Sequence, residues 1–220
     1  MIGELAPPGV HTAEGKIRAD APLHPEEEAL AREMSPARRA EFASARACAR
    51  RALAEIGYAN VAIGRGARRM PLWPPGVVGS LTHRDGRCAG AVGRAGDWLG
   101  IGIDVEPWQP LSRRALERIT LPSERDALRG LSGASSERWG AALFSAKESL
   151  YKALFPQTQL FLGFRDAEIT LSPATPVTGR FTAALLHRPT LDLLQRERFS
   201  GRFALDASGA RIWTCLAVPR

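Results

Sequence analysis

Two long amphipathic helical patterns, each followed by strand-forming segments, constrain the fold more than any other feature of this sequence. The first covers residues 36–56, where Ser35-Pro36 is a typical helix start and Gly57 a typical helix stop. The second covers residues 136–155. Both carry apolar residues at helical spacing: Phe42, Ala45, Ala49, Leu53 and Ile56 in the first, and Trp139, Leu143, Ala146, Leu150 and Leu154 in the second.

Strand-forming segments lie between and after these helices. We expect residues 87–93 and 98–104 to form a hairpin that leaves Asp104 at a strand end. Residues 65–79 are rich in proline and glycine and are expected to form an ordered loop. Three further strands are predicted at 167–171, 202–205 and 212–218, with a hairpin turn at 206–209. Helices and antiparallel hairpins grouped in this way indicate the α+β class and not a βαβ repeat.

Composition narrows the classes of protein. A chain of 220 residues that is 45% hydrophobic can bury one large core or two small ones. Its three cysteines, Cys48, Cys88 and Cys215, are widely separated, so neither a disulfide framework nor a zinc site is indicated. No long apolar run or leader-like segment occurs, so we expect a cytoplasmic protein without a membrane partner. The net charge of +7 comes mostly from arginine and is compatible with nucleic acid, a polyphosphate ligand, an acidic protein or solubility alone.

Two carboxylates two residues apart form the first candidate site. In an extended segment Asp104 and Glu106 project from the same side, with Cα atoms roughly 6 to 7 Å apart. Like charges at that spacing repel unless a cation lies between them. Carboxylate ligands without His or Cys nearby favour Mg²⁺ over zinc. The alternative is an ordinary solvated turn.

The second helix and a polar segment supply further candidates. At 100° per residue Glu148 lies opposite the apolar stripe of its helix, and Lys152 lies one turn further on the same side. These two side chains can share a site, or they can form a surface ion pair worth ~0.3 to 0.5 kcal/mol. His83 ends a Gly-Ser-x-Thr-His run that could bind phosphate oxygens, or it is an incidental loop histidine. Ser80 is not in a GxSxG elbow, so a hydrolase nucleophile is not supported.

Three of these segments, taken in order, carry a family resemblance. WPPGVVGSLTH at 73–83, GIDVE at 102–106 and FSAKESLYK at 144–152 resemble the signature blocks of phosphopantetheinyl transferases, in particular the group of enterobactin synthetase component D. Residues 41–53 and 65–71 also fit that group. The resemblance covers roughly residues 36–170, and the pairing of GIDVE with FSAKESLYK is its most specific part.

The resemblance implies an architecture and a reaction. The fold would be a monomer of two similar α+β subdomains in a pseudo-twofold arrangement, each an antiparallel sheet packed with helices. These subdomains would cover residues 1–103 and 104–220, with the active site in the cleft between them. The enzyme would transfer the phosphopantetheine of coenzyme A to a serine of an acyl or peptidyl carrier protein and release adenosine 3',5'-bisphosphate. It would depend on Mg²⁺, with Mn²⁺ as an alternative.

The resemblance also assigns roles to individual residues. It implies that Glu148, or a water that it orients, takes the serine proton, and that Lys152 and His83 hold phosphates of coenzyme A. One departure from the pattern is Arg84, which follows His83 where relatives often have a small residue and an aromatic. The implied metal ligands are Asp104, Glu106 and Glu148, and the implied contacts to coenzyme A are Arg46, Arg65, Arg69, Ser80, Thr82, His83, Lys147 and Lys152.

Two rival functions are weighed against this one. A basic nucleic-acid-binding protein would explain the arginine content, but no helix-turn-helix, zinc or RNP-type pattern is evident, and no nucleic-acid partner is expected. A Mg²⁺-dependent phosphohydrolase would use the same carboxylates with water as the nucleophile. Incubation with coenzyme A with and without an apo carrier separates hydrolysis from transfer.

Overall fold

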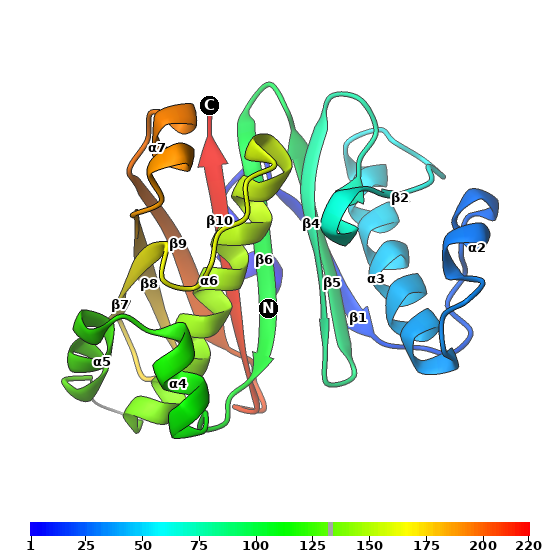
Figure 1. The fold of residues 1–220 in the computed structure, drawn as a ribbon. Coiled ribbons are helices and arrows are strands. Elements are labelled where there is room, and N and C mark those ends of the chain that lie inside the picture. The colour runs from blue at the N-terminus through cyan, green and yellow to red at the C-terminus, as the bar shows by residue number, and fades with distance from the viewer. Residues whose placement is uncertain (132–133) are drawn as a thin grey trace.

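The computed structural model describes residues 1–131 and 134–220, which form two antiparallel sheets side by side and a short two-stranded ladder (Figure 1). The three-stranded sheet has the order β1 (His11–Lys16), β5 (Arg87–Arg94) and β4 (Val77–Arg84). The five-stranded sheet has the order β6 (Trp98–Pro107), β10 (Arg211–Pro219), β9 (Arg198–Leu205), β8 (Thr178–Leu185) and β7 (Ala167–Pro173). The ladder pairs β2 (Gly64–Arg65) with β3 (Pro71–Leu72).

One long helix covers each of the two sheets. In Figure 1, α3 (Pro36–Glu55) lies beside β5 and β1, and α6 (Ser136–Thr158) crosses the front of β6 and β10. The α+β class is therefore confirmed. No helix within the described residues combines the length and the apolar character needed to cross a membrane. The shorter helices are α1 (Ile2–Leu5), α2 (Pro25–Ala31), α4 (Arg113–Ile119), α5 (Pro122–Arg129), α7 (Arg188–Leu194) and the 3₁₀ turn η1 (Ala67–Arg69).

Both predicted long helices are present, and their predicted apolar stripes are buried. The Ser35 side chain caps α3 by accepting a hydrogen bond from the Arg38 backbone amide, and Ser135 caps α6 in the same way. Helix α6 runs three residues beyond the predicted end and stops at Gln159, whose φ of 55° lies in the left-handed region. The predicted strands in the C-terminal third correspond to β7, β9 and β10, with a hairpin joining β9 to β10.

The predicted hairpin between residues 87–93 and 98–104 is wrong. Strand β5 instead pairs with β4 through a tight turn at Asp85 and Gly86, both with positive φ, and β6 pairs with β10 in the other sheet. An Asp-Gly turn of this kind matches the twist of two antiparallel strands, whereas the turn before β6 leads from one sheet to the other. Asp104 consequently lies inside β6 and not at its end.

Two segments expected to be irregular are also partly regular. The polar run ending at His83 is part of β4, so its backbone is committed to a ladder with β5. The 65–79 segment contains η1 and contributes to β2, β3 and β4. The proposed boundary between residues 103 and 104 falls within β6, which pairs with β10 over its length. The division into two similar halves stays a prediction.

Candidate active site

Glycines on β6 let helix α6 lie directly against the strand. A Cβ atom at Gly102 would lie 1.8 Å from the Ser149 carbonyl oxygen, and one at Gly100 would lie 2.1 Å from that of Ala153. Since side chains alternate along a strand, Gly100 and Gly102 share their side of β6 with Asp104 and Glu106. The apolar residues Ile101, Ile103 and Val105 fill the other side, in the core between the two sheets. The sequence of β6 therefore places two carboxylates beside α6.

Asp104 is held by side chains from both halves of the chain. Lys152 of α6 donates to its Oδ1 over 2.6 Å, and Thr82 of β4 donates to the same oxygen over 3.2 Å. Ser145 of α6 donates to Oδ2 over 2.9 Å. Only 4% of Asp104 is exposed. The carboxylate is thus fixed in place by three side chains from two elements, α6 and β4.

Glu106 and Glu148 lie close enough to Asp104 to feel its charge. Burial and the Asp104 carboxylate raise the pKa of Glu106 to about 7, with a further contribution from Glu148. Burial also raises the pKa of Glu148, which Lys152 partly offsets. Glu106 Oε2 lies 3.3 Å from Arg84 Nε. No hydrogen bond from the described residues reaches the Glu148 carboxylate.

The three carboxylates of the cluster do not converge on one point. Among the described residues, no three Asp, Glu, His or Cys side chains are arranged so that they could hold a metal ion. Asp104 is instead paired with Lys152, and Glu106 with Arg84. Burial, and to a lesser extent the neighbouring Asp104 carboxylate, raises the pKa values of Glu106 and Glu148, and the nearby cations offset this only in part. Three carboxylates without a nitrogen or sulfur ligand fit a hard divalent cation.

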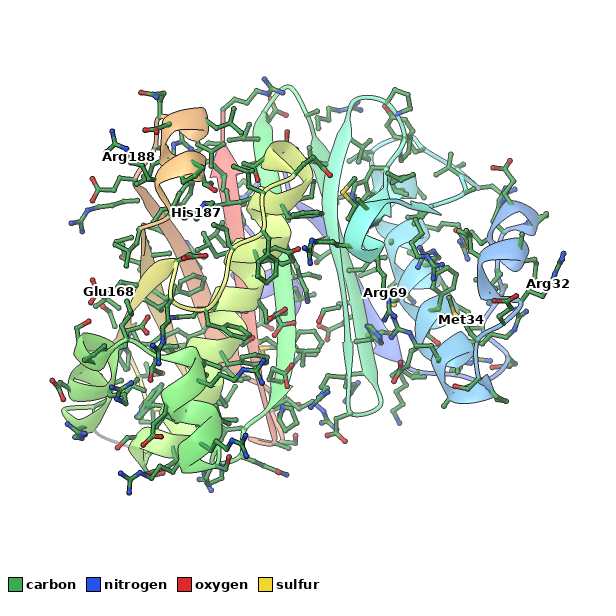
Figure 2. The ribbon with its side chains drawn as sticks, in the orientation of Figure 1. Arg32, Met34, Arg69, Glu168, His187 and Arg188 are labelled. Carbon is green, nitrogen blue, oxygen red and sulfur yellow. The ribbon has the colours of Figure 1, made fainter. Side chains whose placement is uncertain are left out.

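A cavity of about 570 Å³ opens beside this cluster, between α3, the segment around η1, β4 and α6. Glu148 and Lys152 line one part of it. Met34 and Arg69 mark the part beside α3, where Figure 2 shows their side chains. The basic side chains on its wall, which outnumber the acidic ones, are Arg38, Arg46, Arg65, Arg68, Arg69 and Lys152. Such a wall suits an anionic ligand.

His83 lies on the cavity wall between two side chains of α3. Its Nε2 contacts the Arg38 guanidinium and lies 3.3 Å from Glu41 Oε2. Burial and the neighbouring Arg38 lower the pKa of His83 to about 4, so the imidazole is neutral at pH 7. The sequence did not single out Arg38, which the α3 spacing alone could have placed two turns before Arg46.

Arg46 lines the cavity and also holds the neighbouring backbone in place. Its guanidinium donates to the carbonyl oxygens of Ile63 and Gly64, 2.9 and 3.1 Å away, and 4% of the residue is exposed. Burial lowers the pKa of Arg46 to about 10. These bonds tie α3 to the start of β2, which carries Arg65. Arg65 and Arg69 are both exposed on the cavity wall, and their contact with coenzyme A stays a prediction.

The three remaining predicted contacts have different surroundings. Ser80 lines the cavity, but its hydroxyl accepts a hydrogen bond from the Ile103 amide, and Thr82 points at Asp104. Lys147 is not on the cavity wall. Its ammonium donates to Glu124 and to the carbonyl oxygens of Ile119 and Phe164, which uses all three hydrogens. One residue step turns it 100° away from Glu148 around α6, so we leave it out of the proposed site.

Comparison with known proteins identifies the family. The family model of the 4'-phosphopantetheinyl transferase N-terminal domain matches residues 26–93, and that of the 4'-phosphopantetheinyl transferase superfamily matches residues 100–205. The chain is 46% identical over 191 residues to 4'-phosphopantetheinyl transferase Npt of Nocardia iowensis, covering 84% of this chain and 85% of the relative. The chain belongs to the 4'-phosphopantetheinyl transferase superfamily.

The chain is also similar to two further proteins. The chain is 42% identical over 198 residues to 4'-phosphopantetheinyl transferase Svp of Streptomyces mobaraensis, covering 89% of this chain and 78% of the relative. It is 37% identical over 135 residues to enterobactin synthase component D of Escherichia coli K12, covering 60% and 61%. The protein is thus a phosphopantetheinyl transferase, which transfers phosphopantetheine from coenzyme A to carrier proteins. The predicted family and activity are both confirmed.

Two neighbours of Asp104 in this transferase were missed by reasoning from the sequence. Ser145 lies in the FSAKESLYK block, three residues before Glu148, so helical spacing could have placed it on the same side of α6. Thr214 faces Asp104 across the β6–β10 ladder. No local signal marks Thr214, because that pairing joins segments about half the chain apart.

Proposed function

We propose that coenzyme A binds in the basic cavity, with its phosphates near Lys152, His83, Arg65 and Arg69, and that the carboxylate cluster binds Mg²⁺ or, as an alternative, Mn²⁺. One observation carries the proposal: the basic cavity and the cluster share Glu148 and Lys152. A polyphosphate in the cavity would therefore reach the cation held by the cluster. The proposed metal ligands are Asp104, Glu106 and Glu148.

The reaction follows from the chemistry of these side chains. The carrier serine oxygen attacks the β-phosphorus of coenzyme A, the bond from that phosphorus to the bridging oxygen breaks, and adenosine 3',5'-bisphosphate leaves. Glu148, whose pKa is raised by burial, accepts the serine proton. Lys152 stabilises the negative charge on the departing phosphate. When bound, the cation supplies charge neutralisation at the pyrophosphate.

The remaining assignments concern the setting of the enzyme. We propose acyl or peptidyl carrier domains as partners, since a net charge of +7 steers an enzyme toward acidic surfaces. We also propose that the enzyme acts as a monomer. The free thiols of Cys48, Cys88 and Cys215 fit the reducing cytoplasm as its location.

Intact mass spectrometry of an apo carrier tests the metal and the ligands together. With coenzyme A and Mg²⁺ the carrier should gain the mass of phosphopantetheine, and chelation of the metal should abolish the gain. D104N, E106Q and E148Q should each lose transfer. Thermal unfolding of E106Q and E148Q should stay close to that of the parent, whereas D104N should also lose stability because it breaks the buried pair with Lys152. E117Q, which changes an exposed glutamate paired with Arg113, is the matched control. Full transfer in chelated enzyme would refute the metal, and full transfer in all three variants would refute the ligand set.

A further inference from the structure

A chain of buried hydroxyl groups lies directly behind Asp104. Ser145 Oγ, the donor to Asp104 Oδ2, lies 2.9 Å from Thr214 Oγ1, and Thr214 Oγ1 lies 2.6 Å from Ser149 Oγ. All three residues are 0% exposed. Ser145 and Ser149 are one turn apart on α6, and Thr214 is the cross-strand partner of Asp104 on β10. The chain therefore links the helix that carries Glu148 to the sheet that carries Asp104.

Asp104 sets the direction of the hydrogens along this chain. An ionised carboxylate has no hydrogen, so Ser145 gives its only hydroxyl hydrogen to Asp104. Ser145 Oγ can then only accept from Thr214, which shares its hydrogen with the Ser145 carbonyl oxygen 3.0 Å away. Ser149 in turn donates to Thr214. Hydrogen bonds aligned in series polarise one another, which strengthens the last bond to the carboxylate.

Packing alone does not account for a threonine at this position. The other residues of β10 that face α6 are Ile212, Leu216 and Val218, all almost fully buried. The apolar row is interrupted only at Thr214, opposite Asp104. A buried hydroxyl is costly unless it is hydrogen-bonded, whereas a valine would fill the same volume. The hydroxyl is therefore present for its bonds.

The same bonds leave one acceptor position of Asp104 open. An ionised carboxylate has about four lone-pair sites. Lys152 and Thr82 occupy Oδ1, and Ser145 occupies one site of Oδ2. No donor from the described residues takes the second site of Oδ2. We propose that Thr214, acting through Ser145 and supported by Ser149, is a positioning residue that makes Asp104 present this site to the divalent cation. The inference rests on the metal site of the proposed function.

The metal affinity of the variant T214V tests the positioning role of Thr214. Valine fills the same volume as threonine, so a change in metal affinity would not come from lost packing. Mn²⁺ is titrated into enzyme saturated with coenzyme A in the absence of carrier, and free Mn²⁺ is measured by electron paramagnetic resonance. T214V should weaken Mn²⁺ binding by about 10-fold or more, as loss of other outer partners of metal ligands does. Its transfer rate should fall at low Mg²⁺ and recover at high Mg²⁺. T214S, which keeps the hydroxyl, should restore both.

Two further variants guard against a loss of folding. T120V removes another fully buried hydroxyl, one that bonds the Leu116 carbonyl and an arginine but not Asp104, and it should leave Mn²⁺ affinity unchanged. S149A shortens the chain at its far end and should weaken Mn²⁺ by a smaller factor, so it carries the test if T214V does not fold.

The outcomes separate the two proposals. The positioning role is overturned if folded T214V binds Mn²⁺ with the affinity of the parent. If T214V does not fold, the same result in S149A overturns it. It is also overturned if T214S binds Mn²⁺ as weakly as T214V does. If the parent enzyme with coenzyme A binds no Mn²⁺, the metal site itself is refuted and the positioning role falls with it.

Discussion

Replacement of Gly102 by alanine tests how the site is assembled. The added Cβ would lie 1.8 Å from the Ser149 carbonyl oxygen and 3.0 Å from the Ala153 amide nitrogen. Both atoms belong to the backbone of α6, so no side-chain rotation relieves the clash. Helix α6 must move away from β6 by about 1.6 Å to restore an ordinary contact of 3.4 Å.

This displacement should reduce both stability and turnover. Overpacking of this kind costs about 1 to 3 kcal/mol, which lowers the melting temperature by about 2 to 4 °C for each kcal/mol in a protein of this size. Because Glu148 and Lys152 move with α6, their distance from Asp104 increases. A misplacement of about 1 Å can cost 100-fold in rate, so we expect transfer by G102A to fall by at least about that factor.

Thermal unfolding and carrier modification by intact mass, measured on the same preparations, check both effects. G96A is the matched control, because a Cβ at Gly96 would have no heavy atom within 4 Å. G96A should behave like the parent. If G102A also keeps parental melting temperature and turnover, the direct contact between α6 and β6 does not hold the site together.

Three other substitutions probe residues around the site. K147M should cost about 3 to 5 kcal/mol of unfolding free energy, because it leaves the buried Glu124 without its cation. It should not change KM for coenzyme A. A higher KM with parental stability would show that Lys147 contacts coenzyme A after all. Because burial lowers the pKa of His83 to about 4, the fold should lose stability as pH falls below about 6.5, by about 2 kcal/mol at pH 5. Urea titrations at several pH values should show that H83Q removes this loss. The same dependence of unfolding free energy on pH in H83Q and in the parent would contradict the prediction. R46K should raise KM for coenzyme A with little change in kcat, since it loosens the strand that carries Arg65; a reduced kcat at constant KM would point to direct participation in the reaction.

Local patterns predicted the elements that local forces build. The stripes of α3 and α6 recur every three to four residues within a single segment, and Ser35 and Ser135 cap helices within one turn, so both helices were predictable. The pairing of β6 was not. Its partner β10 follows more than 100 residues later, and apolar strands carry no mark of their partner. The β4–β5 hairpin does have a local signal, the Asp-Gly turn at 85–86.

The candidate site shows the same division between local and long-range information. Spacing of two in a strand put Asp104 and Glu106 on one side of β6, and that side faces α6. The partners that arrive from elsewhere, such as the guanidinium beside His83 and Thr214 behind Asp104, depend on how the helices and sheets pack. Lys147 illustrates the converse: a residue inside the most specific motif serves the fold, because adjacent helical positions point in different directions.

A crystal of the enzyme grown with coenzyme A and Mn²⁺, with diffraction recorded at the manganese absorption edge, tests the central claim most directly. We predict one anomalous peak within bonding distance of the carboxylates of Asp104, Glu106 and Glu148, with the pyrophosphate of coenzyme A beside it and beside Lys152. A manganese peak elsewhere, or a pyrophosphate remote from all three carboxylates, would contradict the account.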